Sequence, residues 1–177
     1  MYQFEEQLQK LQRKKVKIVA GTGYPYEQVD TIFDSHGNAA IRRLHRVGVK
    51  NVGGVTIDRV EVQLEKIEPP TQVRTPVPLR VMHDRPVTNN AARREFSLDL
   101  DQTEYIDVVM KDEWPGNPAN PFVVPHTVTF VQTGMDPRRY EFTIFAHGDG
   151  AEPDRAVFLV DLDDNNRLRV QPKQISS

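Results

Sequence analysis

The stretch that decides the fold class is Arg46-Val-Gly-Val-Lys-Asn-Val-Gly-Gly-Val-Thr-Ile-Asp-Arg-Val-Glu-Val-Gln-Leu64. Every second residue is apolar on both sides of its central glycines, from Val47 to Val49 before them and from Val60 to Leu64 after them. A period of two residues places one face of a segment against a core and the other face in water. The stretch therefore predicts a strand, a glycine turn and a second strand.

Similar alternation recurs along most of the chain, in segments separated by residues typical of turns. Residues 41–51 and 55–67 are expected to form the opening pair of strands. Further strands are expected at residues 16–20, 76–83, 94–100, 104–110, 126–132, 140–147, 155–162 and 167–170. Residues 24–38 and 112–121 are expected to be loops, and Asp163-Asp-Asn-Asn166 to form the last hairpin turn. This pattern predicts an all-β sandwich of antiparallel sheets.

The same alternation predicts which side chains form the core. They are Val47, Val49, Val60, Val62, Leu64, Phe96, Leu98, Ile106, Val108, Phe142, Ile144, Phe158 and Val160.

One helix is predicted, over residues 3–14. Phe4, Leu8 and Leu11 are spaced at i, i+4 and i+7, which makes a single narrow apolar stripe. A helix of about three turns is marginal alone in water, so this one must dock, pair or fray. We therefore divide the chain into an interaction arm at residues 1–14, a sandwich at 15–172 and a disordered tail at 173–177. The basic residues near the helix are Lys10, Arg13, Lys14, Lys15 and Lys17.

The composition argues against several classes of function. The formal net charge is −2, which gives no general attraction to nucleic acid. The chain has no cysteine, which excludes a disulfide framework and thiol catalysis and is compatible with a cytoplasmic location. Neither a signal peptide nor a membrane span is expected from the sequence. The basic arm leaves weak association with a membrane surface open.

Two passages resemble known domain families. Asp136-Pro-Arg-Arg-Tyr140-Glu-Phe-Thr-Ile-Phe-Ala146 resembles the penultimate strand of an immunoglobulin-like domain, in which a tyrosine hydroxyl bonds back to the upstream backbone. Phe96-Ser-Leu-Asp-Leu-Asp-Gln-Thr-Glu-Tyr-Ile-Asp-Val108 resembles a strand–turn–strand unit of bacterial immunoglobulin-like and fibronectin-III-like domains. The resemblance implies an immunoglobulin-like antiparallel β-sandwich, with Tyr140 buried and its hydroxyl bonded to backbone.

Over residues 4–170 the chain also resembles a group of small bacterial proteins. The matching stretches are Phe4-Glu-Glu-Gln-Leu8, Arg46-Val-Gly-Val-Lys-Asn51, Pro78-Leu-Arg-Val-Met-His-Asp84 and Tyr105-Ile-Asp-Val-Val109. That group implies no activity and no cofactor, so it supports the fold and assigns no catalytic residue.

Candidate chemical motifs are incomplete. The histidines form no H-x-x-H pair, and His45 is in phase with the buried valines, which indicates an interior histidine rather than a metal ligand. In His83-Asp84-Arg85, neighbours on a strand point to opposite faces and do not make an acid–base pair. We therefore expect no catalytic, cofactor-binding or metal-binding residue.

The turn at Asp161–Asn166 is the nearest approach to a calcium loop. Asp161, Asp163 and Asn165 occupy its first, third and fifth places, but Asn166 and Pro172 stand where glycine and glutamate are required. Weak calcium binding at this turn stays open.

The sequence therefore favours a non-enzymatic binding or scaffolding module that contacts another protein or a copy of itself through the helix. The candidate contact residues are Phe4, Leu8, Leu11, Lys14, Lys15 and Trp114. The alternative is a carbohydrate-binding sandwich, which needs Trp114 and either Tyr105 or Tyr24 on one exposed platform. A hydrolase that uses His83 and nearby carboxylates ranks last.

Overall fold

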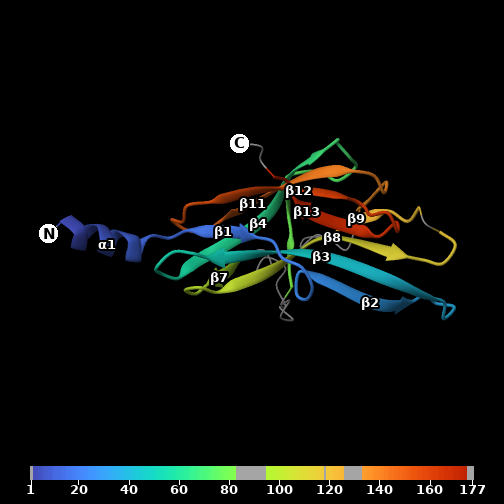
Figure 1. Ribbon diagram of the computed structural model, residues 1–177, viewed down its shortest axis with the longest axis horizontal. Coiled ribbons are helices and arrows are strands. Elements are labelled where there is room, and N and C mark those ends of the chain that lie inside the picture. The colour runs from blue at the N-terminus through green and yellow to red at the C-terminus, as the bar shows by residue number, and fades with distance from the viewer. Residues whose placement is uncertain (1, 83–94, 118, 126–132, 175–177) are drawn as a thin grey trace.

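The alternating segments fold into two antiparallel sheets that pack face to face, as the computed structural model shows for residues 2–82, 95–117, 119–125 and 133–174 (Figure 1). The predicted all-β sandwich with a short N-terminal helix is confirmed.

The first sheet is built around β3 (Ala39–Asn51) and β8 (Thr103–Glu113), which pair along most of their length. On its other side, β3 pairs with β1 (Val16–Val19) near one end and with β2 (Glu27–Phe33) near the other. The far side of β8 pairs with β6 (Arg80–Val81) and β9 (Phe122–Val124), and β10 (Thr133–Met135) follows β9.

The second sheet is built around β4 (Ile57–Glu68) and β11 (Tyr140–His147). Beyond β11 come β12 (Asp154–Leu162) and then β13 (Leu168–Pro172) at the edge. On its other side, β4 pairs with β5 (Val77–Pro78) and β7 (Phe96–Leu98).

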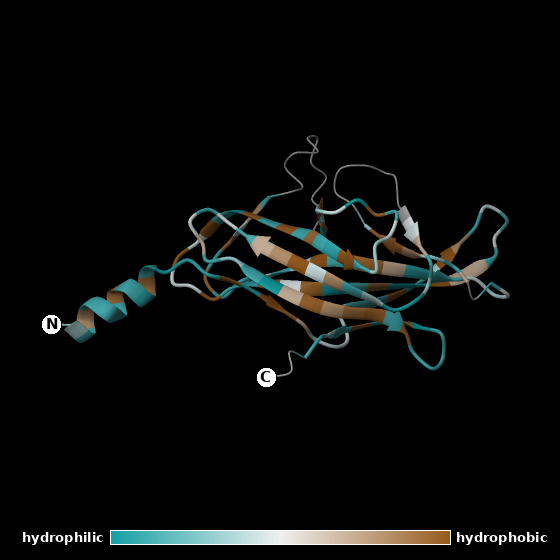
Figure 2. Cartoon of the chain, turned by 90° about the horizontal axis from the view of Figure 1, so that it is seen from above, coloured by the Kyte–Doolittle hydropathy of each residue, from teal (hydrophilic) through white to brown (hydrophobic). Residues whose placement is uncertain are grey.

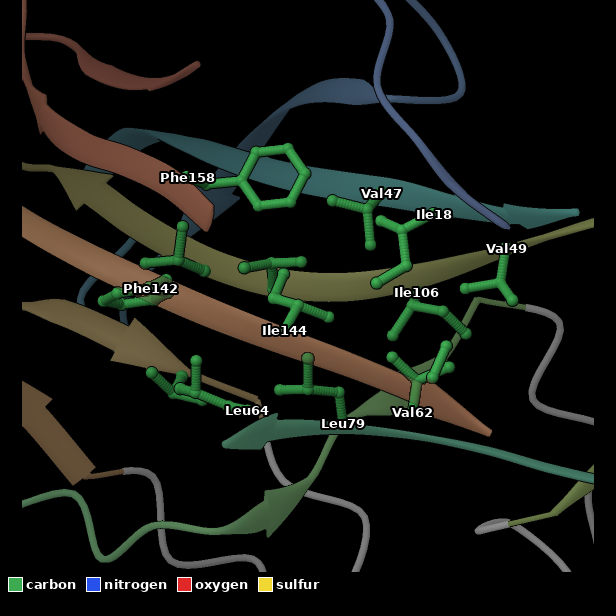
Figure 3. Close-up of a cluster of buried hydrophobic side chains, with 14 of the residues drawn as sticks. Ile18, Val47, Val49, Val62, Leu64, Leu79, Ile106, Phe142, Ile144 and Phe158 are labelled. Carbon is green, nitrogen blue, oxygen red and sulfur yellow. The ribbon is translucent and has the colours of Figure 1, made fainter. Parts of the chain in front are cut away.

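The core lies between the two sheets, where Val47, Val49 and Ile106 of the first sheet face side chains of the second (Figure 3). Every side chain predicted for the core is buried except Phe96, which is half-buried. The hairpin turn at 163–166 is also confirmed, since β12 and β13 pair on either side of it.

Two of the predictions about strands were wrong. Residues 24–38 were expected to be a loop, but they contain β2, whose side chains are mostly exposed and so give no clear burial pattern. The segments 41–51 and 55–67 were expected to pair with each other. They form β3 and β4 instead, which lie in different sheets.

The buried side chain of Asn51 explains this change of sheet. Its amide nitrogen donates to the carbonyl oxygens of Val55 (2.8 Å) and Leu98 (3.0 Å), and its amide oxygen accepts from the N–H of Gly53 (2.9 Å). These bonds hold an arch that carries the chain from one sheet to the other, whereas a two-residue hairpin would keep both strands in one sheet.

Other boundaries differ in smaller ways. The segment at 76–83 is divided into β5 and β6, which belong to different sheets, and β8 extends into the expected loop as far as Glu113. The expected strand at 126–132 lies outside the described residues.

Tyr140 is buried, and its hydroxyl donates to the carbonyl oxygen of Asp136 (2.9 Å), as expected. However, both β12 and β13 follow β11, so Tyr140 does not lie on the penultimate strand.

The helix α1 (Tyr2–Gln12) projects beyond one end of the sandwich (Figures 1 and 2). None of its residues is buried. Figure 2 shows that it is mostly hydrophilic, with isolated apolar positions, whereas the strands carry many hydrophobic residues.

Candidate interaction sites

The apolar stripe of α1 is open to solvent. Phe4, Leu8 and Leu11 are 69%, 42% and 62% exposed. Their spacing puts them on one face of the helix, and the helix contributes no buried side chain to the sandwich. The sequence thus identified the stripe correctly, and the structure leaves it unpaired within the described residues.

The linker segment, residues 13–15, is held by backbone hydrogen bonds, although no residue of the helix before it is buried. The carbonyl oxygens of Arg13 and Lys15 accept from the N–H groups of Gly54 and Val52, both at 2.9 Å. On the other side, the carbonyl oxygen of Lys14 accepts from the N–H of Glu152 (2.9 Å). The linker therefore lies between the β3–β4 arch and the chain just before β12, which fixes where α1 leaves the body.

The glycine pair in the β3–β4 arch makes room for the linker. A Cβ atom on Gly54 would lie 1.8 Å from the carbonyl oxygen of Leu11, and one on Gly53 would lie 2.1 Å from that of Arg13. No side chain fits at such distances, so the backbone at the C-terminal end of α1 contacts the arch directly. The sequence identified these glycines as a turn, but not as the contact for the linker.

The basic residues beside α1 are partly neutralised. Arg13 and Lys15 both pair with Glu152, with the Lys15 Nζ atom 3.1 Å from Oε1. Hydrogen bonds from Lys15 and Arg13 hold the pKa of Glu152 below its ordinary value. Among the predicted contacts, Lys14 has no ion pair with a described residue, while Lys15 is already engaged.

Trp114 is half-buried just after β8 and lines a small cavity of about 140 Å³ with Met110, Asn120 and Pro121. Tyr105 is nine residues earlier, which corresponds to roughly 30 Å along an extended strand. Tyr105 instead contacts Tyr26 edge to face, with ring centroids 5.3 Å apart. The structure therefore does not bring Trp114 and Tyr105 onto one platform.

A buried charge cluster was missed by the sequence analysis. The carboxylate of Asp107, which is 2% exposed, accepts from the Nε atoms of Arg46 and Arg80, both at 2.7 Å. The Arg46 guanidinium also donates to the side-chain oxygen of Gln28 (2.7 Å) and to the carbonyl oxygen of Pro25 (3.1 Å). Alternation assigned Arg46 and Asp107 to the solvent-exposed face. Their burial follows only from the pairing of the two residues across β3 and β8.

His45 is interior, as expected. Its Nε2 atom lies 3.1 Å from the carbonyl oxygen of Leu168 on the opposite sheet. Burial lowers the pKa of His45 below its ordinary value, although the nearby carboxylate of Glu27 opposes this. The histidine therefore connects the two sheets in its neutral form.

The acidic turn uses its carboxylates to stabilise itself. Asp163 Oδ1 accepts from the backbone N–H groups of Asn165 (2.8 Å) and Arg167 (2.9 Å), and these bonds lower the pKa of Asp163. Both oxygens of Asp161 accept from Arg169 at 2.8 Å. Within the described residues, no group of three or more acidic or histidine side chains could hold a metal ion. The triplet His83-Asp84-Arg85 and His126 lie outside those residues.

An open groove of about 480 Å³ lies between the two sheets at the edge strand β13. It is lined by residues of both sheets, including His45 of the first and Phe158 and Val170 of the second, and by Tyr26 from the turn before β2. Its floor mixes apolar and charged side chains, and Arg46 and Arg169 are both already paired with carboxylates. No local pattern indicates this groove, because its lining residues are far apart in the chain.

Comparison of this chain with protein-family models, with curated proteins and with solved structures finds no match. Among the described residues, no helix is long and apolar enough to cross a membrane. The geometry of α1, its linker and the sheets therefore carries the argument on function.

Proposed function

We propose that this protein is a non-enzymatic protein-binding module in which α1 is the element that contacts the partner. The observation that carries the proposal is the exposed stripe of Phe4, Leu8 and Leu11 on a helix whose attachment is fixed by residues 13–15. The sandwich serves as a rigid body that presents this helix.

The energetics of α1 support a partner. An isolated helix of eleven residues is marginal in water, and none of the residues of α1 is buried against its own sandwich. Covering each large apolar side chain contributes about 1.5–3 kcal/mol. An apolar groove that takes residues at i, i+4 and i+7 is a common way for proteins to bind a helix, and it would stabilise α1 as it binds.

The charges of α1 favour a protein over a membrane surface. Helices that lie on membranes are usually rich in lysine and arginine on their polar face. Here Glu5 and Glu6 outweigh Lys10, and Arg13 and Lys15 are paired with Glu152.

The helix alone is also a poor site for self-association. Three apolar side chains from each copy would be almost its whole contribution, because a helix already uses most of its backbone hydrogen-bonding groups internally. A groove on a different protein is therefore the partner surface that we propose.

The proposal includes assignment to the immunoglobulin-like domains and a cytoplasmic location. The bond from the Tyr140 hydroxyl to the Asp136 carbonyl oxygen supports the first. The absence of cysteine is compatible with the second.

The test replaces the stripe without removing the helix. A triple variant, Phe4→Gln, Leu8→Gln and Leu11→Gln, keeps good helix formers and leaves residues 13–15 in place. The matched control, Glu6→Gln with Lys10→Gln, changes side chains outside the stripe and keeps the net charge. Each protein is immobilised and exposed to extract from the native cell, and any captured protein is purified and titrated against all three.

We expect to capture a single protein that binds the wild type and the control with similar affinity. It should bind the triple variant at least tenfold more weakly. Equal binding to the triple variant would contradict the role of the stripe. Binding to vesicles of anionic lipid without any captured protein would show that the partner is a membrane.

A further inference from the structure

Within the described part of the chain, the outer edge of β2 carries backbone groups that pair with no strand. Among the described strands, β2 pairs only with β3. Just outside its two ends, the Tyr26 carbonyl oxygen accepts from Arg46 N–H (2.7 Å), and Asp34 N–H donates to the Asn38 carbonyl oxygen (3.0 Å). Backbone groups alternate in direction along an antiparallel strand, so even-numbered residues face β3. Val29, Thr31 and Phe33 therefore point their N–H and C=O groups away from the sheet.

This edge has little protection against pairing. Free edges are commonly blocked by proline, a bulge or charged side chains, lysine above all; along Glu27–Phe33, β2 has no proline, lysine or bulge, and its charges are the carboxylates of Glu27 and Asp30. Val29 and Phe33 are 55% and 68% exposed on the same face. By contrast, the edge strand β13 ends at Pro172, and its Leu168 carbonyl oxygen contacts His45.

We infer that β2 pairs with β2 of a second copy of this chain, antiparallel and about a two-fold axis at Thr31. In this register Val29 lies opposite Phe33 of the second copy, and Thr31 lies opposite its own counterpart. Aromatic pairs with β-branched residues and threonine pairs are favourable across antiparallel strands. The edge is thus complementary to itself.

Charge selects this register over its neighbour. With the axis at Asp30, the two Asp30 carboxylates would lie directly opposite each other and repel. With the axis at Thr31, Asp30 lies opposite Ile32 of the second copy, and Gln28 lies opposite Asp34. No two like charges then face each other along the strand.

The pairing leaves α1 free. β2 contacts residues 39–45 of β3, whereas the linker segment contacts the arch at the opposite end of that strand. Figure 1 shows α1 and β2 toward opposite ends of the molecule. The dimer would therefore carry its two helices at opposite ends, and its formation does not depend on the function proposed for α1.

The test uses the two-fold position itself. Thr31→Lys and Thr31→Glu each place like charges opposite each other in a homodimer, while an equal mixture places lysine opposite glutamate. Molar mass is measured by light scattering during size-exclusion chromatography and by sedimentation equilibrium. We expect the wild type at twice the mass of one chain, each variant alone at the mass of one chain, and the mixture at twice that mass again.

The control is Gln171→Lys, which adds the same charge to the edge strand β13 and should remain dimeric. The α1 triple variant should also remain dimeric, which separates this inference from the proposed function. The inferred dimer would be overturned by a wild type that stays monomeric at high concentration or by a dimeric Thr31→Lys variant. It would also be overturned by a mixture that stays monomeric or by loss of the dimer in Gln171→Lys.

Discussion

The strands β1 and β2 pair with the same strand, β3, on the same side of the first sheet, yet their surroundings are opposite. In β1, Val16 and Ile18 are buried, and their N–H groups donate to the Glu152 carbonyl oxygen (3.2 Å) and to Asp154 Oδ2 (2.8 Å). In β2, Val29 and Phe33 are exposed, and no described strand pairs with the outer edge.

The difference shows that an apolar side chain on a strand becomes part of the core only where the second sheet covers it. At the β1 end, the chain just before β12 closes the gap between the sheets. At the β2 end, the groove beside the edge strand β13 lies between the sheets, and Val29 and Phe33 stay exposed. This side of the sandwich is therefore covered near β1 and exposed near β2.

The largest expected effect on stability comes from making the same substitution, valine to aspartate, in each of the two strands. Val16→Asp buries a carboxylate without a partner and should unfold the protein or lower its unfolding free energy by at least about 3 kcal/mol. Val29→Asp should change it by no more than about 0.5 kcal/mol. Urea denaturation at a concentration too low for dimers measures both. Similar losses in the two variants would remove the contrast between the strands.

The next effect concerns the charge cluster that anchors the start of β2. Asp107→Asn leaves the buried Arg46 without its counter-charge and should cost about 3 kcal/mol of unfolding free energy. The control is Asp112→Asn, also on β8 and paired with an arginine of β3, whose side chain is 27% exposed rather than 3%. Because exposed pairs contribute little, it should cost less than about 1 kcal/mol. Equal costs measured by thermal denaturation would show that burial of the cluster does not matter.

A smaller effect is expected at Tyr140, in the second sheet. Tyr140→Phe keeps the ring and removes the bond to Asp136, so a loss of about 1 kcal/mol is expected in chemical denaturation. Tyr24→Phe, at an exposed position, should have no measurable effect. Wild-type stability in the Tyr140 variant would mean that its hydroxyl is not needed to hold the backbone there.

The smallest expected effect is a pH dependence of stability caused by His45, which lies on β3 opposite the first residue of β2. Burial lowers its pKa in the folded state, so the unfolded state binds the proton more readily. The stability that depends on neutral His45 is therefore present above the unfolded pKa of about 6.5 and is lost as the pH falls below it. Denaturation from pH 7.5 to 5 should show the wild type losing more stability than His45→Gln. Parallel curves would exclude this contribution.

Much of the fold followed from local pattern. Alternation around Val47, Val62 and Phe142 predicted their burial, because side chains two residues apart share one face of a strand. The turn after β12 and the hydroxyl bond of Tyr140 were also recognisable, since turns and single buried hydroxyls depend on short-range chemistry. The stripe of α1 was readable in the same way.

Only the tertiary structure decided which strands are neighbours. Alternation is the same whether two segments form a hairpin or cross between sheets, and here the buried amide of Asn51 decides for the crossing. Likewise, Arg46 and Asp107 become a buried pair only through the register of β3 and β8. The sequence determined which faces are apolar, but coverage of a face depends on contacts between residues far apart in the chain, and this is why the exposed edge of β2 could not be foreseen.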